Sequence, residues 1–407
     1  MAAETTGPDA DGQKVAIRPW ARLDAMDWIA IGLLIGGVVA IATGLLPTTV
    51  AKATVSRIFP LLVFLGAVIV LAELAAKAEL FDVIAVRLTA LGKGRNVLMF
   101  VLSLAFAAAI TIFLNLDTTA VLLTPVLIAT ARRAQLPVLP FAMTTVWLAN
   151  TASLLLPVSN LTNLLAADRI DLKPLAFAER MALPQAASLL AIGVCLWWFY
   201  WRTNPSRYPV PERHRPRNVL LFRIAAVCVG TFVVAILVGV SVTIAALVTS
   251  IALLAAFVWL RRADLAWQLL PWRLLVFVTG LFLVMDTVGR LGLSDFMAWL
   301  IGTDSGTSGV VRAATVGAVA SNVLNNLPSY VAGEAVVPIP NHDQLIGLLI
   351  GTNVGPLVLP WASLATLIWY ERCRADGLTV SWPRFIGTGL VAAALTLAAS
   401  VAALLIG

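Results

Sequence analysis

The stretch that decides the fold is VLMFVLSLAFAAAITIFLNLDTTAVLLTPVLIATARR, residues 97–133. Two apolar arms flank a short polar tip, Asn115 to Thr119, which contains the carboxylate of Asp117. The next charged residues along the chain are Arg132 and Arg133. Polar backbone at membrane depth is tolerated only where it faces protein or a water-filled cavity. The stretch therefore predicts a re-entrant hairpin over 95–134 with Asp117 at its tip.

The composition places the rest of the chain in a membrane as well. The 407 residues are 60% hydrophobic and 12% charged, whereas soluble domains are roughly 25% charged. Residues 27–46 and 385–407 are long enough to cross a bilayer as helices. The net charge of +7 comes from basic residues in short connections, which indicates cytoplasmic loops beside a lipid bilayer rather than nucleic-acid binding. We expect an all-α polytopic protein of the cytoplasmic membrane.

Hydropathy and loop charge together predict about nine transmembrane spans and two re-entrant hairpins. Residues 1–25 are expected to form a cytosolic N-terminal tail, and 204–217 a basic cytoplasmic linker. The basic segments are assigned to the cytoplasm, and the acidic ones, 291–310 and 331–343, to the outside. The basic segments are 77–95, 131–136, 202–217, 261–273 and 371–384. The spans are expected near 26–47, 57–76, 137–167, 183–203, 219–238, 240–260, 268–288, 344–375 and 384–406, and the hairpins at 95–134 and 308–330.

An internal repeat relates the two halves, 26–203 and 218–407. A shift of 203 residues lays Asn150 over Asn353 and Pro157 over Pro360, within two segments, 137–167 and 344–375, that we expect to be broken helices. The same shift lays Thr118-Thr119 over Ser321-Asn322. The loop charges give the halves opposite orientation. An inverted repeat of this kind is the usual plan of an alternating-access transporter.

Four polar clusters lie at membrane depth: 115–119, 157–163, 321–326 and 359–366. Each has Pro or grouped Asn, Ser and Thr, which interrupt helices and bond nearby backbone. An interrupted helix leaves free N–H groups at one new end and free carbonyls at the other, and these ends bind anions and cations respectively. We expect the two hairpin tips and the two broken helices to meet near the membrane midplane and enclose a small polar site.

Asp117 has two compatible roles in this picture. Asp is a favoured N-cap, so its carboxylate is expected to cap the second arm of the hairpin. A carboxylate inside a bilayer is also costly and marks a functional site, as a cation ligand or proton carrier. Two other acids, Glu73 and Asp286, lie near span ends, where a structural ion pair such as Asp286 with Arg290 is an equal alternative.

Signatures of enzymes are missing from the sequence. It has no phosphate-binding glycine loop, no zinc-binding His-Glu-x-x-His and no Gly-x-Ser-x-Gly elbow. Cys195, Cys228 and Cys373 are too scattered to predict a disulfide framework or a thiolate metal site. We therefore expect no enzymatic activity, no metal and no cofactor other than a coupling ion, H+ or Na+.

The polar clusters resemble those of the arsenite/antimonite efflux pump family, within the ion transporter superfamily that includes the sodium-coupled dicarboxylate and citrate carriers. The resemblance runs from about Ala42 to near the end of the chain. Its motifs are LDTTAVLLTPVL (116–127), LANTASLLLPVSNLTNLLAAD (148–168), SNVLNNLPSYV (321–331), IGTNVGPLVLPWASLATLIW (350–369) and GLTVSWPRFIGTGLV (377–391). It implies a carrier with two hairpins that expels trivalent arsenic or antimony, driven by the proton motive force or assisted by a separate ATPase subunit. Relatives of this plan are often homodimers.

The resemblance also implies which residues form the site. Leu116, Asn150, Asn353 and Leu357 stand where the family often has Asn, Asp, Asp and Lys, so ionic coupling is expected to depend on Asp117. A carrier for another small anion, such as a dicarboxylate or inorganic oxyanion, with sodium as coupling ion, is the alternative. The expected substrate-binding residues are Asn115, Thr118, Thr119, Asn150, Ser159, Asn160, Asn163, Asn322, Asn325, Asn326, Asn353, Ser363 and Thr366.

Overall fold

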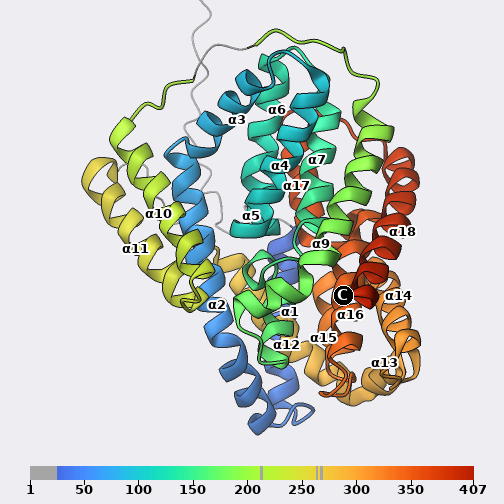
Figure 1. The fold of residues 1–407 in the computed structure, drawn as a ribbon. Helices are drawn as coiled ribbons and strands as arrows, with labels where there is room; N and C mark the ends of the chain where they lie inside the picture. Colours follow the sequence, from blue (N-terminus) through green and yellow to red (C-terminus); the bar gives the residue numbers. More distant parts are fainter. Residues whose placement is uncertain (1–24, 211–213, 263–264, 266–268) are drawn as a thin grey trace, which may run out of the picture.

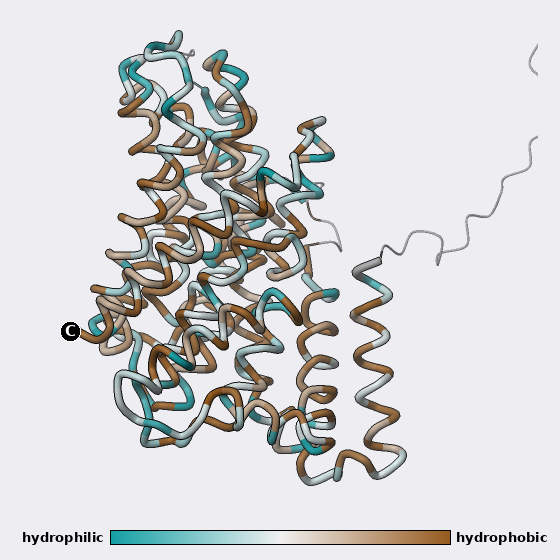
Figure 2. Tube along the Cα trace, turned by 90° about the vertical axis from the view of Figure 1, so that its right-hand side faces the viewer, coloured by the Kyte–Doolittle hydropathy of each residue, from teal (hydrophilic) through white to brown (hydrophobic). Residues whose placement is uncertain are grey.

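The computed structural model describes residues 25–210, 214–262, 265 and 269–407, which form a bundle of helices (Figure 1). Figure 2 shows hydrophobic residues along the long helices and hydrophilic ones gathered in the connections at the two ends. The predicted tail, 1–25, lies outside the described residues except for its last residue. Seven described helices are long and apolar enough to cross a membrane: Thr48–Lys77, Asn96–Leu114, Pro174–Trp201, Val219–Leu237, Val242–Leu260, Trp272–Ile301 and Trp382–Ile406. The predicted class, an all-α polytopic membrane protein, is confirmed.

The elements follow the predicted order of spans, hairpins and broken helices. The spans are α1 (Ala25–Ala42), α2 (Thr48–Lys77), α9 (Pro174–Leu196), α10 (Val219–Leu237), α11 (Val242–Leu260), α12 (Trp272–Val288) and α18 (Trp382–Ile406). The broken helices are α7 (Val138–Thr151) with α8 (Leu161–Arg169), and α16 (His342–Val354) with α17 (Leu364–Ala375). The first hairpin is α4 (Asn96–Leu114), α5 (Leu116–Thr118), a π-helical turn (Thr119–Leu123) and α6 (Thr124–Arg133); the second is α14 (Thr307–Leu324) and α15 (Asn326–Glu334). Figure 1 shows them in opposite halves of the molecule, as expected of an inverted repeat.

The first pieces of the two broken helices are deeply buried. Every residue of α7 from Pro140 to Thr151 is buried, and so is every residue of α16 from Gln344 to Val354. The interruptions that follow these helices are therefore surrounded by protein rather than lipid. This setting is what permits non-helical backbone at membrane depth.

In each half of the chain, the helix that precedes the long span packs against the long span of the other half. Helix α1, which precedes α2 in the chain, packs against α12, whereas α11, which precedes α12, packs against α2. The contact of α1 with α12 is close because Gly280 has no side chain: a Cβ there would lie 2.4 Å from the backbone nitrogen of Leu34. Small residues allow such close approach between membrane helices.

Two sequence predictions need correction. Helix α2 begins at Thr48 rather than at 57, and Arg57, predicted as its first residue, lies inside the helix and is paired with Glu334 and Asp168. The segments 77–95 and 291–310, which were assigned to connections outside the membrane, contain the short helix α3 (Leu80–Leu91) and the helix α13 (Ser294–Ile301), which continues the long helix that begins at Trp272. The carboxylate of Asp286, for which an ion pair with Arg290 was one of two alternatives, accepts a hydrogen bond from the Thr54 hydroxyl on α2.

Candidate functional site

The tip of the first hairpin is formed by Asn115. Helix α4 ends at Leu114, and Asn115 takes a φ of 118° and a ψ of 171°. Its side-chain carbonyl oxygen accepts a hydrogen bond from the Thr118 N–H at 2.8 Å, so Asn115 is the N-cap of α5. The prediction that Asp117 caps this arm is therefore wrong. Asp117 lies inside the first turn, because the chain reverses two residues earlier than the polar pattern suggested.

The second hairpin turns in the same way at Asn325. This residue has a φ of 117° and a ψ of 156°, and its side-chain oxygen accepts a bond from the Leu327 N–H at 3.4 Å. Backbone of this kind is nearly confined to glycine and costs about 1–3 kcal/mol for other residues. Two matching tips also correct the repeat: Ser321-Asn322 precede their tip whereas Thr118-Thr119 follow theirs, so the 203-residue shift does not apply to the hairpins.

Asn353 joins the two broken helices. Its side-chain oxygen accepts hydrogen bonds from Asn160 Nδ2 at 2.8 Å and from Thr162 Oγ1 at 2.9 Å, and its Nδ2 donates to Asn163 Oδ1 at 2.8 Å. The repeat-related pair is weaker: Asn150 Nδ2 lies 3.4 Å from Thr366 Oγ1. Asn353 therefore holds the start of α8 against the end of α16.

Four helix starts surround a central cavity of ≈ 40 Å³. They belong to α8, α15, α17 and the continuous helical segment that begins with α5. The rest of the wall is apolar and comes from α2 and α12. Free N–H groups at helix starts favour negative charge or oxygen acceptors. The lining residues are Leu65, Leu116, Asp117, Asn160, Leu161, Leu274, Phe277, Val278, Asn325, Asn326, Leu327, Ser363 and Leu364.

Comparisons with known proteins show the family of the chain and a similar fold. The citrate transporter family matches residues 25–366. The chain belongs to the citrate transporter family. It is 26% identical to an arsenical pump membrane protein of Escherichia coli over 91% of each chain, and 28% identical to that of Yersinia enterocolitica over 83% of this chain and 84% of the relative. The YdaH transporter of Alcanivorax borkumensis has a similar fold, with a TM-score of 0.60 at 14% identity over 94% of this chain and 97% of that chain.

The predicted site residues of this membrane transporter divide into two groups. The first group lines the space where a substrate can bind: Asp117, Asn160, Asn325, Asn326 and Ser363 in the central cavity, and Thr118 beside it. Among the described residues, Thr118 Oγ1, Ser363 Oγ and Asn115 Nδ2 are buried without a hydrogen-bond partner. Buried polar atoms are normally paired, so the two that line these spaces, Thr118 Oγ1 and Ser363 Oγ, are available to a ligand, whereas Asn115 lines neither space.

The second group is occupied in holding the backbone together. Asn322 donates to the Gly355 carbonyl at 2.8 Å and accepts from the Leu359 N–H at 3.0 Å, which fastens the second hairpin to its broken helix. Ser159 Oγ donates to the Ile112 carbonyl at 2.8 Å and fastens the first hairpin to its broken helix. Neither residue lines the cavity. The others that bond protein rather than lining the cavity are Asn115, Thr119, Asn150, Asn163, Asn353 and Thr366.

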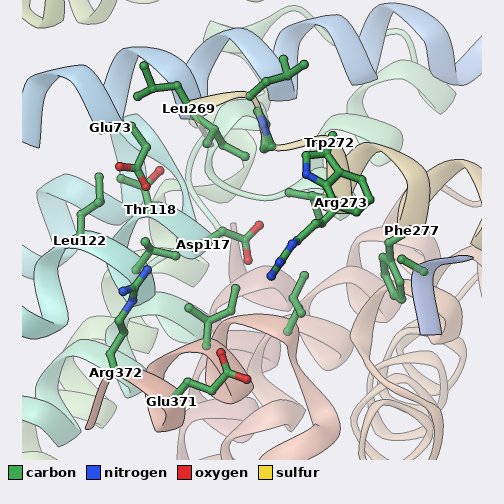
Figure 3. Close-up of a pocket in the computed structure, with 18 residues that line it drawn as sticks. Glu73, Asp117, Thr118, Leu122, Leu269, Trp272, Arg273, Phe277, Glu371 and Arg372 are labelled. Carbon is green, nitrogen blue, oxygen red and sulfur yellow. The ribbon is translucent and has the colours of Figure 1, made fainter. Parts of the chain in front are cut away.

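A larger pocket of ≈ 450 Å³, here called the vestibule, lies beside the central cavity. Asp117, Leu274, Phe277 and Leu364 line both spaces and form the boundary between them. Figure 3 shows Glu73, Arg273, Glu371 and Arg372 around the vestibule, with the Asp117 carboxylate and the Arg273 guanidinium extending into it.

Sequence reasoning missed Arg273, Glu371 and Arg372 as pocket residues. All three were counted as loop or loop-edge charges, which is what their positions near the ends of α12 and α17 suggest. Their position in the sequence, one or two helical turns from an apolar span, could have indicated that they line a pocket. Arg273 also forms an ion pair with Asp27 of α1 at 2.7 Å, a partner distant in sequence.

Proposed function

We propose that this transporter expels arsenite or antimonite across the cytoplasmic membrane by alternating access. The observation that carries the proposal is the central cavity itself, where Asn, Ser and helix N–H groups converge with one carboxylate. Relatives over most of the chain are named arsenical pump membrane proteins. A small polar site closed by two hairpins suits a carrier that binds one small solute at a time.

The chemistry of the cavity suits trivalent arsenic. In water this element is chiefly a small, neutral trihydroxide, which both donates and accepts hydrogen bonds. Amide, hydroxyl and backbone N–H groups bind such a solute weakly, and weak binding lets the cargo leave. No cysteine is among the described residues that line the cavity or the vestibule, so the site is not a thiolate trap.

The loop charges support an inward-facing state. Under the positive-inside assignment, the segments that lead into α12 and out of α17 are cytoplasmic. The vestibule is lined by residues at those same ends, so it lies on the cytoplasmic side of the central cavity. We therefore describe the structure as facing inward, with the cavity ready to receive substrate from the cytoplasm.

We propose Asp117 as the residue that couples transport to the proton motive force. It forms part of the boundary between cavity and vestibule, so a proton on its carboxylate and a substrate in the cavity occupy adjoining positions. Exchange follows if the carboxylate releases a proton inward when substrate binds and gains one from outside when substrate leaves. Under this scheme no ATPase subunit is required.

Transport of a small anion, such as citrate, a dicarboxylate or an inorganic oxyanion, is the second candidate. The family description, the converging helix starts and the basic side chains Arg273 and Arg372 favour it. Relatives that match most of the chain are, however, named arsenical pump membrane proteins, and this is our reason for ranking arsenite first.

Growth of an arsenite-sensitive bacterium that lacks its own pump tests the proposal. The chain should restore growth on arsenite, and it should not support growth on citrate as the carbon source. Restored growth on citrate with none on arsenite, with the protein detected in the membrane, would replace the first candidate with the second.

A further inference from the structure

A cluster of charged side chains joins three elements on the side of the molecule opposite the vestibule. Arg57 of α2 forms an ion pair with Glu334 at the end of α15, and its Nε lies 3.5 Å from Asp168 Oδ2 at the end of α8. Arg169 Nε lies 4.0 Å from Glu334 Oε1. The Glu334 side chain is only 3% exposed, so the cluster is partly withdrawn from water. Asp286, at the end of α12, accepts a hydrogen bond from Thr54, one turn before Arg57.

The second half of the chain repeats these charges. The shift of 203 residues that lays Asn150 over Asn353 also lays Asp168-Arg169 over Glu371-Arg372, at the ends of the matching helices α8 and α17. Arg57 lies in the first half of α2, and Arg273 lies at the start of α12. Asp286 lies near the end of α12, and Glu73 lies near the end of α2. The signs agree for all four pairs; Arg57 with Arg273 and Glu73 with Asp286 are related by shifts of 216 and 213 residues, and the second set has no counterpart of Glu334.

The two sets differ in what they contact. In the first set, Arg57, Asp168 and Arg169 are joined through ion pairs with one another or with Glu334, and Asp286 accepts a hydrogen bond from Thr54. In the second set, Glu73, Arg273, Glu371 and Arg372 line the vestibule, and Arg273 is paired with Asp27 of α1 (Figure 3). Across the described residues, no ion pair within 4.0 Å involves Glu73, Glu371 or Arg372.

We propose that the two sets are alternating gates, related by the internal repeat. The first set is the outer gate and holds the outer side closed in this structure. The second is the inner gate, which forms the corresponding ion pairs when the vestibule closes and the outer cluster separates. Because each state then keeps one set of ion pairs, the two states stay close in free energy, as a carrier that must cycle requires. This inference rests on the alternating-access part of the proposed function, but it does not depend on the substrate.

Side-specific labelling of a single cysteine tests the gates. The probe is Leu364→Cys, at the boundary of cavity and vestibule, in the full chain with Cys195, Cys228 and Cys373 changed to Ala. A membrane-impermeant thiol reagent is added either to intact cells or to inside-out vesicles. Glu334→Gln weakens the outer gate and should lower the ratio of inside to outside labelling by about fivefold or more. Glu371→Gln weakens the inner gate and should raise the same ratio.

Three further variants make the result decisive. Asp343→Asn removes the Arg180–Asp343 ion pair on the outer side and should leave the ratio unchanged. Glu334→Asp keeps the charge and should return the ratio toward that of the parent. If Glu334→Gln does not reach the membrane, Arg57→Gln takes its place with the same expected direction. Shifts in one common direction, or no shift in either gate variant, would overturn the gates. Opposite shifts without arsenite transport would retain the gates and remove the proposed substrate.

Discussion

Asp117 is the one acid among the described residues that line the central cavity, and its position gives the sharpest prediction at the scale of single residues. Asn115 provides the cap of the hairpin, so the carboxylate of Asp117 is not needed for that fold. Asp117→Asn should therefore abolish proton-driven arsenite transport while the protein keeps its amount and its Tm. The matched control is Asp295→Asn, on an exposed position of α13, which should transport normally. Full transport by Asp117→Asn would remove the coupling role.

Substitution of Asn353 and of Ser363 distinguishes a residue that stabilises the fold from one that we expect to bind substrate. Asn353→Ala leaves three buried groups of α8 unpaired and should lower the free energy of unfolding by about 3 kcal/mol, seen as a lower Tm in detergent. Ser363→Ala removes a hydroxyl that has no protein partner among the described residues, so it should cost less than about 1 kcal/mol and instead raise the KM for arsenite. The reverse pattern would contradict our division of the site.

This division is the part of the site that the sequence could not supply. Asn326 and Asn353 are both buried asparagines, and both were predicted to bind substrate. Only the folded chain brings Asn163 and Asn160 to Asn353, from about 190 residues away, and leaves Asn326 facing the cavity. The local pattern identifies which residues are polar at membrane depth, whereas their partners depend on tertiary packing.

At the scale of elements, the two hairpin tips make a prediction about strain. Asn325 has a positive φ, and its side chain caps α15. Glycine can adopt the same φ but has no side chain to form the cap. Asn325→Gly should cost only a few tenths of a kcal/mol. Asn325→Ala should cost about 1–3 kcal/mol, because alanine adopts this backbone poorly. Thermal unfolding of the two variants side by side measures the difference, and equal Tm values would show that the tip is not strained.

Hairpins and broken helices were predictable because breakers, polar residues and apolar arms are local signals. The start of α2, the short helix α3 and the continuation of the long helix into α13 were not, since Arg57 finds its partners on other elements and α3 is below span length. The register between the hairpins was also misjudged. The polar pairs at 118–119 and 321–322 were aligned with each other because their side chains are similar, whereas the chain turns at Asn115 and Asn325.

At the scale of the whole molecule, helices α1 and α11 each pack against the opposite half of the chain. They therefore connect the two halves, which must move relative to each other when the gates open and close. Gly280→Ala places a Cβ against the backbone of α1 and should lower the free energy of unfolding by about 1–3 kcal/mol, with less transport. Gly387→Ala on α18, where nothing lies within 4 Å, should leave the Tm equal or higher. Equal tolerance of both substitutions would contradict close packing of α1 on α12.

The central claim is that the cavity between the four helix starts carries arsenite outward in exchange for protons. The most direct measurement is arsenite uptake by proteoliposomes that contain only the purified chain, with an imposed proton gradient and no ATP. We predict gradient-dependent uptake by the parent that is lost in Asp117→Asn and unaffected by excess citrate. Uptake that ignores the gradient, or a gradient that drives citrate and not arsenite, would contradict the account.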